Sequence, residues 1–108
     1  MKRFFVHYVN GQPRAVLYNP SKHRPAKYLY YKDADGSELL LVGDIAVDYH
    51  KVLLELFERG KGKVKGALCG AGDARCLNGS DGWCSNGFNF RTPEDNKERI
   101  RKLLTEPR

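Results

Sequence analysis

The sequence predicts an α+β fold, in which a mostly antiparallel or mixed sheet carries two helices packed on it, within a single domain over residues 1–108. Three observations lead to this prediction. Two strand pairs with turn sequences between them occupy the first half, an amphipathic helical pattern follows, and a strong helix start lies near the end. The hydrophobic content of 41% is sufficient for one core of this size.

Two hairpins are predicted from turn residues that separate strand-like segments. Residues 4–9 are aromatic and β-branched, and Asn10-Gly11 separates them from a second segment at 14–18. Asn-Gly accepts the positive φ angles of a type I′ turn, which favours a hairpin here. Segments 28–31 and 38–42 flank an Asp-Ala-Asp-Gly turn sequence and give the second hairpin.

An amphipathic helix is predicted after the second hairpin. Asp44 or Asp48 can cap its first turn, and Gly60 provides the stop. Its apolar residues recur at intervals of three and four, at Tyr49, Val52, Leu53, Leu56 and Phe57.

Three more strands and a second helix are predicted in the rest of the chain. The strands are expected at 64–69, 74–77 and 83–90, with a turn at 78–82. Residues 92–95, Thr-Pro-Glu-Asp, start a helix, because they combine a capping side chain, a first-turn proline and acidic residues near the positive dipole end. Its buried stripe is expected at Ile100, Leu103 and Leu104.

Charge and cysteine content limit the partners and the compartment. The net charge of +6 favours an anionic partner, such as phosphate, nucleic acid or an acidic protein surface, although solvated surface lysine explains it equally well. Three cysteines and no apolar run after the first residues indicate a reducing, cytoplasmic setting. No apolar stretch approaches the roughly 20 residues of a membrane helix, so no membrane partner is expected, and we expect a monomer.

His50 is the first candidate for chemistry. It lies in the first turn of the first predicted helix, where unpaired backbone N–H groups and the helix dipole favour an anion. A histidine near its ordinary pKa can accept a proton at neutral pH. The alternative is a partly buried histidine that is hydrogen-bonded to backbone.

A glycine-rich segment provides the second candidate. After the strand predicted at 64–69, Gly70 to Arg75 are expected to form a loop whose N–H groups approach phosphate. The spacing of Cys69, Gly72 and Arg75 resembles the signature loop of cysteine-dependent phosphatases, which implies a thiolate nucleophile at Cys69. That chemistry needs a helix directly after Arg75, whereas the predicted turn at 78–82 does not continue one.

Two short motifs resemble a second phosphatase family. Asp48-Tyr49-His50 opens the first helix, and Gly72-Asp73-Ala74-Arg75 follows downstream. Together with the order of strands, helix, three strands and helix, these motifs resemble the phosphohistidine phosphatase, or Janus, family over most of residues 1–105. The resemblance implies His50 as general base, no metal and no cofactor, and a phosphorylated protein or small phosphoramidate as substrate.

The same resemblance implies a set of phosphate contacts. They come from a basic residue of the first strand, the loop arginine and backbone N–H groups of the last strand, namely Lys2 or its neighbour Arg3, Arg75, Ser85 and Gly87. The loop departs from the family pattern, because Asp73 and Ala74 replace two glycines. A carboxylate that pointed into the site would repel phosphate.

Three non-phosphatase functions remain as alternatives. Tyrosines and lysines within 27–32 form a nucleic-acid stacking platform if the rings are exposed, whereas strand tyrosines otherwise pack on their neighbours. A small inhibitor or adaptor that binds an acidic protein is the second alternative. A zinc site, the third, lacks the close cysteine pair typical of such sites and would draw on Cys69, Cys76, Cys84 and His50.

Overall fold

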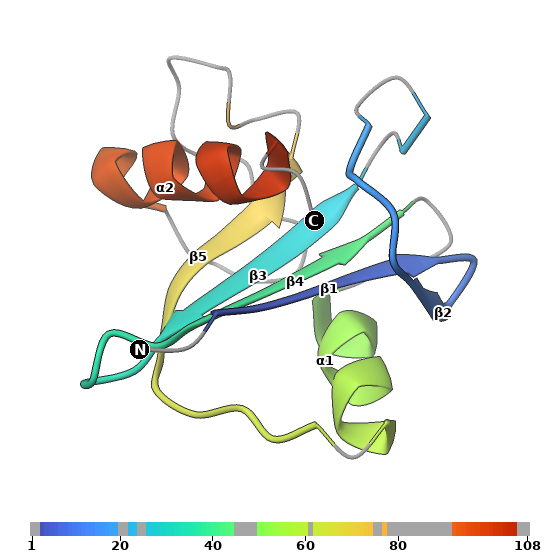
Figure 1. Cartoon of the computed structure of the whole chain (residues 1–108), viewed down its shortest axis with the longest axis horizontal. Helices are drawn as coiled ribbons and strands as arrows, with labels where there is room; N and C mark the ends of the chain where they lie inside the picture. Colours follow the sequence, from blue (N-terminus) through green and yellow to red (C-terminus); the bar gives the residue numbers. More distant parts are fainter. Residues whose placement is uncertain are drawn as a thin grey trace.

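The computed structural model contains a five-stranded mixed sheet with one helix on each face (Figure 1). The α+β fold with two packed helices is therefore confirmed. The elements are β1 (Arg3–Val9), β2 (Gln12–Arg14), β3 (Lys27–Lys32), β4 (Glu38–Gly43), α1 (His50–Arg59), β5 (Ala67–Asp73) and α2 (Glu94–Thr105). The structure describes residues 3–19, 22–23, 26–44, 50–60, 62–74, 77 and 92–105.

The strands follow the order β2-β1-β4-β3-β5, and β1 and β4 are the parallel neighbours among otherwise antiparallel pairs. Both predicted hairpins form. Asn10 and Gly11 have φ values of 53° and 76°, as a type I′ turn requires. The second strand of the first hairpin spans Gln12–Arg14 and not the predicted 14–18, because the chain leaves β1 after Arg14 and the carbonyl oxygen of Val16 faces the His7 ring instead.

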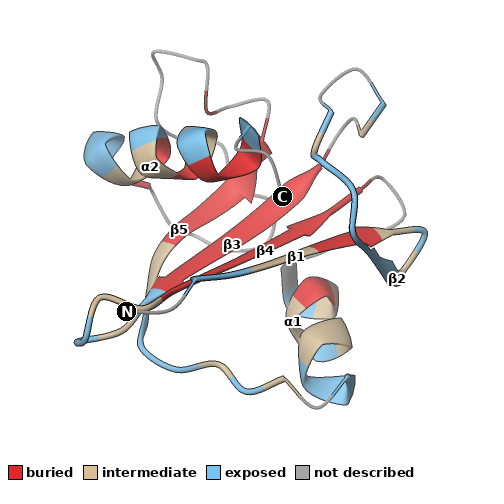
Figure 2. Cartoon of the chain, viewed as in Figure 1, coloured by how far each residue is buried: buried red, intermediate tan, exposed pale blue. Residues whose placement is uncertain are grey.

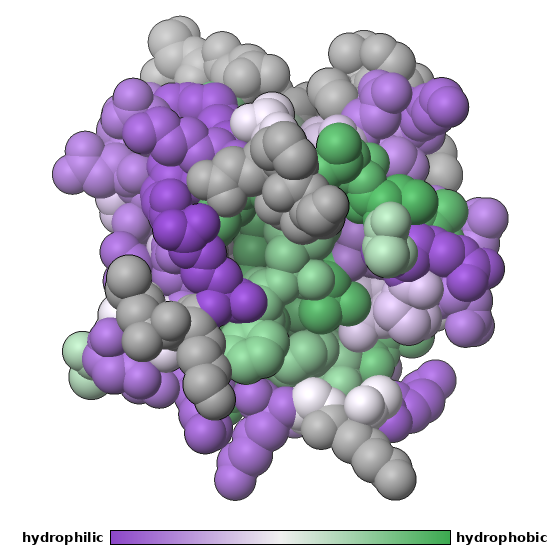
Figure 3. All heavy atoms as spheres, viewed as in Figure 1, coloured by the Kyte–Doolittle hydropathy of each residue, from purple (hydrophilic) through white to green (hydrophobic). Residues whose placement is uncertain are grey.

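Each face of the sheet has its own apolar core (Figure 2). Alternation along β3 directs Tyr28 and Tyr30 toward α2, and Leu29 and Tyr31 toward α1. The three tyrosines are only 2%, 0% and 8% exposed, so the stacking platform is wrong and the packing alternative is confirmed. In one space-filling view, hydrophobic side chains occupy the middle of the surface and hydrophilic ones its margin (Figure 3).

Both helices were predicted correctly. α1 ends where Gly60 donates its N–H to the carbonyl of Leu56, and Leu53 is fully buried against the sheet. α2 buries the predicted stripe of Ile100, Leu103 and Leu104. Within the described ranges, neither helix is long and apolar enough to cross a membrane.

The glycine-rich segment is a strand, which corrects the predicted loop. β5 continues through Gly70 and Gly72, and Gly72 pairs with Tyr28. A Cβ at Gly70 would lie 2.8 Å from Cδ1 of Ile100, so this glycine lets α2 approach the sheet. The strand predicted at 74–77 is also wrong where it is described, because Ala74 and Leu77 have 3₁₀-helical conformation. The predicted turn at 78–82 and strand at 83–90 lie outside the described residues.

Candidate functional site

Strand register divides the polar groups of the sheet between two ends. At one end, Arg3 and Lys32 pair with Glu38, and Lys32 pairs with Ala67; we call this row the Glu38 end. At the other, Tyr8 and Lys27 pair with Gly43, and Lys27 pairs with Asp73; we call this row the Asp73 end.

Helix α1 covers one face of the sheet. Val52, Leu53 and Phe57 belong to the apolar core that Leu29 and Ala71 form on that face. Phe57, in the last turns of α1, also lines a groove with Leu39 near the start of β4.

A buried ion pair lies at the Asp73 end. Nζ of Lys27 is 3.8 Å from Oδ1 of Asp73, and the two side chains are 7% and 2% exposed. Lys27 alternates with Leu29, and Asp73 with Ala71, both of which belong to the core under α1, so the pair lies on the α1 face. Burying two charges is costly unless they are closely paired, and 3.8 Å is longer than a hydrogen bond. The predicted repulsion from an inward Asp73 carboxylate is thus countered by Lys27.

Two further buried ionisable residues lie near this end. The Asp44 carboxylate accepts the N–H of Asn10 at 3.1 Å. His7 is fully buried, and its Nδ1 lies 3.5 Å from the carbonyl oxygen of Val16, which can only accept a hydrogen bond. Nε2 of His7 has no hydrogen-bond partner. Burial, and then the neighbouring His23, lower the pKa of His7, which favours its neutral form.

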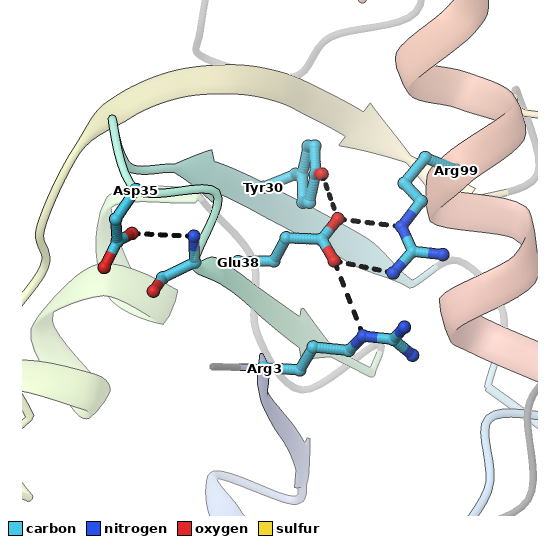
Figure 4. Close-up of polar contacts among 6 residues, drawn as sticks. Arg3, Tyr30, Asp35, Glu38 and Arg99 are labelled. Atoms are coloured by element: carbon cyan, nitrogen blue, oxygen red, sulfur yellow. Dashed lines mark hydrogen bonds and ion pairs between the residues drawn. The ribbon is translucent and has the colours of Figure 1, made fainter. Parts of the chain in front are cut away.

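The Glu38 end carries a cluster of a different kind (Figure 4). The Glu38 carboxylate accepts bonds from Nε and Nη2 of Arg99 at 2.8 and 2.6 Å, and another from the Tyr30 hydroxyl. Nε of Arg3 lies 3.8 Å from Oε1 of Glu38. The Arg99 hydrogen bonds are the main cause that lowers the pKa of Glu38 to about 2, whereas burial and then the bond to Glu38 raise the pKa of Tyr30. This cluster ties β1, β3 and β4 to α2.

The structure describes only some of the predicted site residues. His50 begins α1, and α1 packs on the face of the sheet that also carries Asp73. Arg3 lies at the Glu38 end beside Glu38, so its proposed phosphate contact is not supported by the sheet register. Lys2, Arg75, Ser85 and Gly87, and the side chain of His50, lie outside what the structure describes.

Lys27 is the residue that the sequence-based interpretation missed at this site. It was grouped with the tyrosines of a nucleic-acid platform, but the structure buries it beside Asp73. One signal was present: a lysine directly before the run Tyr28 to Tyr31 occupies a strand that is buried on both faces. A lysine in such a strand is almost never fully buried without a charged partner.

Cys69 is not placed for the cysteine-dependent mechanism. It lies inside β5, its thiol donates to the carbonyl of Ala67 at 3.4 Å, and its own carbonyl accepts a bond from Asn96. The phosphate-binding loop predicted directly after Cys69 is therefore wrong, because residues 70–73 belong to β5. In the described part of the chain, no three potential metal ligands gather, and the zinc alternative's Cys76 and Cys84 lie outside that part.

Comparisons with protein-family models, curated proteins and solved structures gave no match. The family resemblance therefore stays a prediction from short motifs.

Proposed function

We propose that this chain binds phosphate at the Asp73 end and hydrolyses phosphoramidate bonds without a metal, as a protein histidine phosphatase with His50 as general base. One observation supports it above the others. The buried ammonium of Lys27, beside Asp73 at the end of β5, lies on the face of the sheet that α1 covers. The substrate is a phosphorylated protein or a small phosphoramidate, met by a monomer in the cytoplasm.

The start of α1 suits an anion. The first N–H groups of a helix have no partner within it, and the helix dipole adds positive potential there. The first turn of α1 carries no acidic residue that would compete with a ligand. Lys27 supplies a full positive charge from the neighbouring strand, which is held 3.8 Å from Asp73 and is thus only loosely neutralised.

The reaction requires an attacking water and a protonated leaving group. His50 takes a proton from water as its oxygen attacks phosphorus, and the phosphorus–nitrogen bond breaks. The proton held by His50 then passes to the leaving nitrogen. Lys27 balances the charge that develops on the phosphoryl oxygens. The predicted contacts from Arg75, Ser85 and Gly87 would complete the phosphate site.

Hydrolysis of phosphoramidate tests the proposal. His50→Ala should lower the rate by about 10²- to 10⁴-fold, the usual effect of losing a general base, with the thermal unfolding midpoint unchanged. Lys51→Ala, at the next and exposed position of α1, is the matched control and should keep the wild-type rate. Cys69→Ser should also remain active. Equal rates for His50→Ala and wild type would reject the mechanism, and salt-sensitive oligonucleotide binding without hydrolysis would favour a basic binding module.

A further inference from the structure

A groove of about 490 Å³ lies at the Glu38 end, at the other end of the sheet from the proposed phosphate site. Its apolar lining comes from β1, β4 and α1, through Phe4, Leu39 and Phe57. Residues of the β3–β4 turn and of the connection from α1 to β5 also line it. Its volume lies within the range of roughly 300–1,000 Å³ that is typical of small-molecule sites.

Two glycines fix the position of the α1–β5 connection, which forms one wall of the groove. Gly62 donates its N–H to the carbonyl of Phe57 at 2.9 Å, and a Cβ at Gly62 would lie 2.5 Å from the Phe57 ring. At Gly66, with a φ of +87°, a Cβ would lie 2.4 Å from the carbonyl oxygen of Lys32. Only glycine fits these close approaches without movement of its neighbours. The groove is thus set by packing at both ends of this connection.

Phe4 supplies an unusual apolar surface. Phe4 is 55% exposed, whereas the other two apolar residues of the groove, Leu39 and Phe57, are buried and partly buried. Exposed aromatic surface next to a concave apolar site marks a place where an apolar group can be covered. Val16 and Leu17, which are 42% and 47% exposed, do not line this groove.

Charges of both signs line the same groove from different segments. Asp33 and Asp35 come from the β3–β4 turn, and their carboxylates accept the N–H groups of Ala34 and Ser37 at 2.7 and 2.8 Å (Figure 4 shows the second bond). The bonds with Ser37 lower the pKa of Asp35, so this carboxyl is anionic at neutral pH. The cations, Lys63 and Lys65, come from the α1–β5 connection and are exposed.

We propose that this groove binds a free hydrophobic amino acid. The apolar side chain of the ligand covers Phe4, Leu39 and Phe57, its ammonium group faces the carboxylates of the turn, and its carboxylate faces the lysines of the connection. A zwitterion matches a groove with both signs of charge, whereas a simple anion or cation would meet one repulsive wall. This site is independent of the proposed phosphatase, because it lies at the opposite end of the sheet.

The test compares three ligands of nearly equal size by isothermal titration calorimetry. L-phenylalanine should bind saturably. Phenethylamine, which lacks the carboxylate, and hydrocinnamate, which lacks the ammonium group, should each bind at least about tenfold more weakly. Amide signals of Ser37, Gly62 and Phe57 should shift on addition of phenylalanine, and inorganic phosphate should not displace it. Equal binding of the three ligands, or no saturable binding at millimolar concentration, would overturn the proposal.

Variants locate the site. Phe4→Ser should weaken phenylalanine binding about tenfold, because the ligand loses an apolar contact. Leu17→Ser removes a similarly exposed apolar side chain outside the groove and should leave affinity unchanged. Lys65→Gln should weaken the binding of hydrocinnamate and phenylalanine but not the binding of phenethylamine. The same loss in Leu17→Ser as in Phe4→Ser would contradict the assignment, whatever the phosphatase assay shows.

Discussion

The two ends of the sheet treat buried charge in opposite ways. At the Glu38 end, one carboxylate receives two hydrogen bonds from Arg99 and one from Tyr30. At the Asp73 end, Lys27 and Asp73 are both buried, and their charged atoms lie 3.8 Å apart. A carboxylate that accepts several hydrogen bonds acts as a structural tie, whereas the Lys27 ammonium lies beyond hydrogen-bond distance of Asp73 and can still donate to a ligand.

Removing the buried ammonium of Lys27 should have the largest effect on stability. Lys27→Met should lower the free energy of unfolding by about 3 kcal/mol, because the Asp73 carboxylate loses the ammonium group beside it in a buried site. Urea denaturation measures the change. Lys27→Met combined with Asp73→Asn should recover at least half of it. No loss in the single variant would mean that the pair contributes nothing to stability.

Glu38→Gln should have the next largest effect on stability. Glu38→Gln should cost about 2 kcal/mol, less than Lys27→Met because the stranded Arg99 is 28% exposed and can reach water. The depressed pKa of Glu38 makes its contribution complete above pH 4.5, its ordinary value, and progressively lost as the pH falls toward about 2. Acid titration of stability should show this loss in wild type and lack it in the variant.

The control for that acid titration is Glu55→Gln, which changes an exposed carboxylate of α1. It should retain the wild-type stability and the wild-type fall between pH 4.5 and about 2. If Glu38→Gln kept the same acid profile as this control, the Arg99 contact would not be what holds the pKa of Glu38 low.

Asp73→Asn should raise the affinity for phosphate and lower the stability of the fold. Asp73→Asn removes a negative charge from the proposed phosphate site, so inorganic phosphate should bind about tenfold more tightly even though the fold is weakened. Asp35→Asn, an exposed change at the other end of the sheet, is the control and should leave phosphate affinity unaltered. Weaker phosphate binding in Asp73→Asn would argue that the carboxylate helps to orient Lys27.

Arg3 should have the smallest effect. It is 52% exposed and lies 3.8 Å from Glu38, so Arg3→Gln should cost less than about 1 kcal/mol. Phosphate affinity should stay at the wild-type value, because Arg3 lies at the Glu38 end. A marked loss of phosphate binding in this variant would restore Arg3 as a ligand and contradict the separation of the two ends.

The fold was predictable where local pattern and tertiary packing agree. The type I′ turn at Asn10-Gly11, the amphipathic α1 and the stripe of α2 follow from turn chemistry and periodicity. Residues 70–73 of β5 were predicted as a loop because of their glycines. Their role depends on α2, since Gly70 leaves space for the side chain of Ile100, and no local pattern contains that contact.

The candidate site was predictable only in part. His50 at a helix start is a local feature, and the sequence provides it. Lys27 needed the sheet order, because β3 lies between β4 and β5 and is buried on both faces. The position of Arg3 also needed the sheet order: the parallel pairing of β1 with β4 sets which end of the sheet it reaches, and parallel partners are distant in sequence.

Phosphate binding at the Asp73 end can be measured by titrating ¹⁵N-labelled protein with inorganic phosphate. The amides of His50, Lys27 and Asp73 and of the predicted contacts Ser85 and Gly87 should show saturable shifts, and the signal of Gly36 in the β3–β4 turn should not shift. Lys27→Met should weaken the binding. Shifts confined to the Glu38 end, or saturable binding that Lys27→Met leaves unchanged, would contradict it.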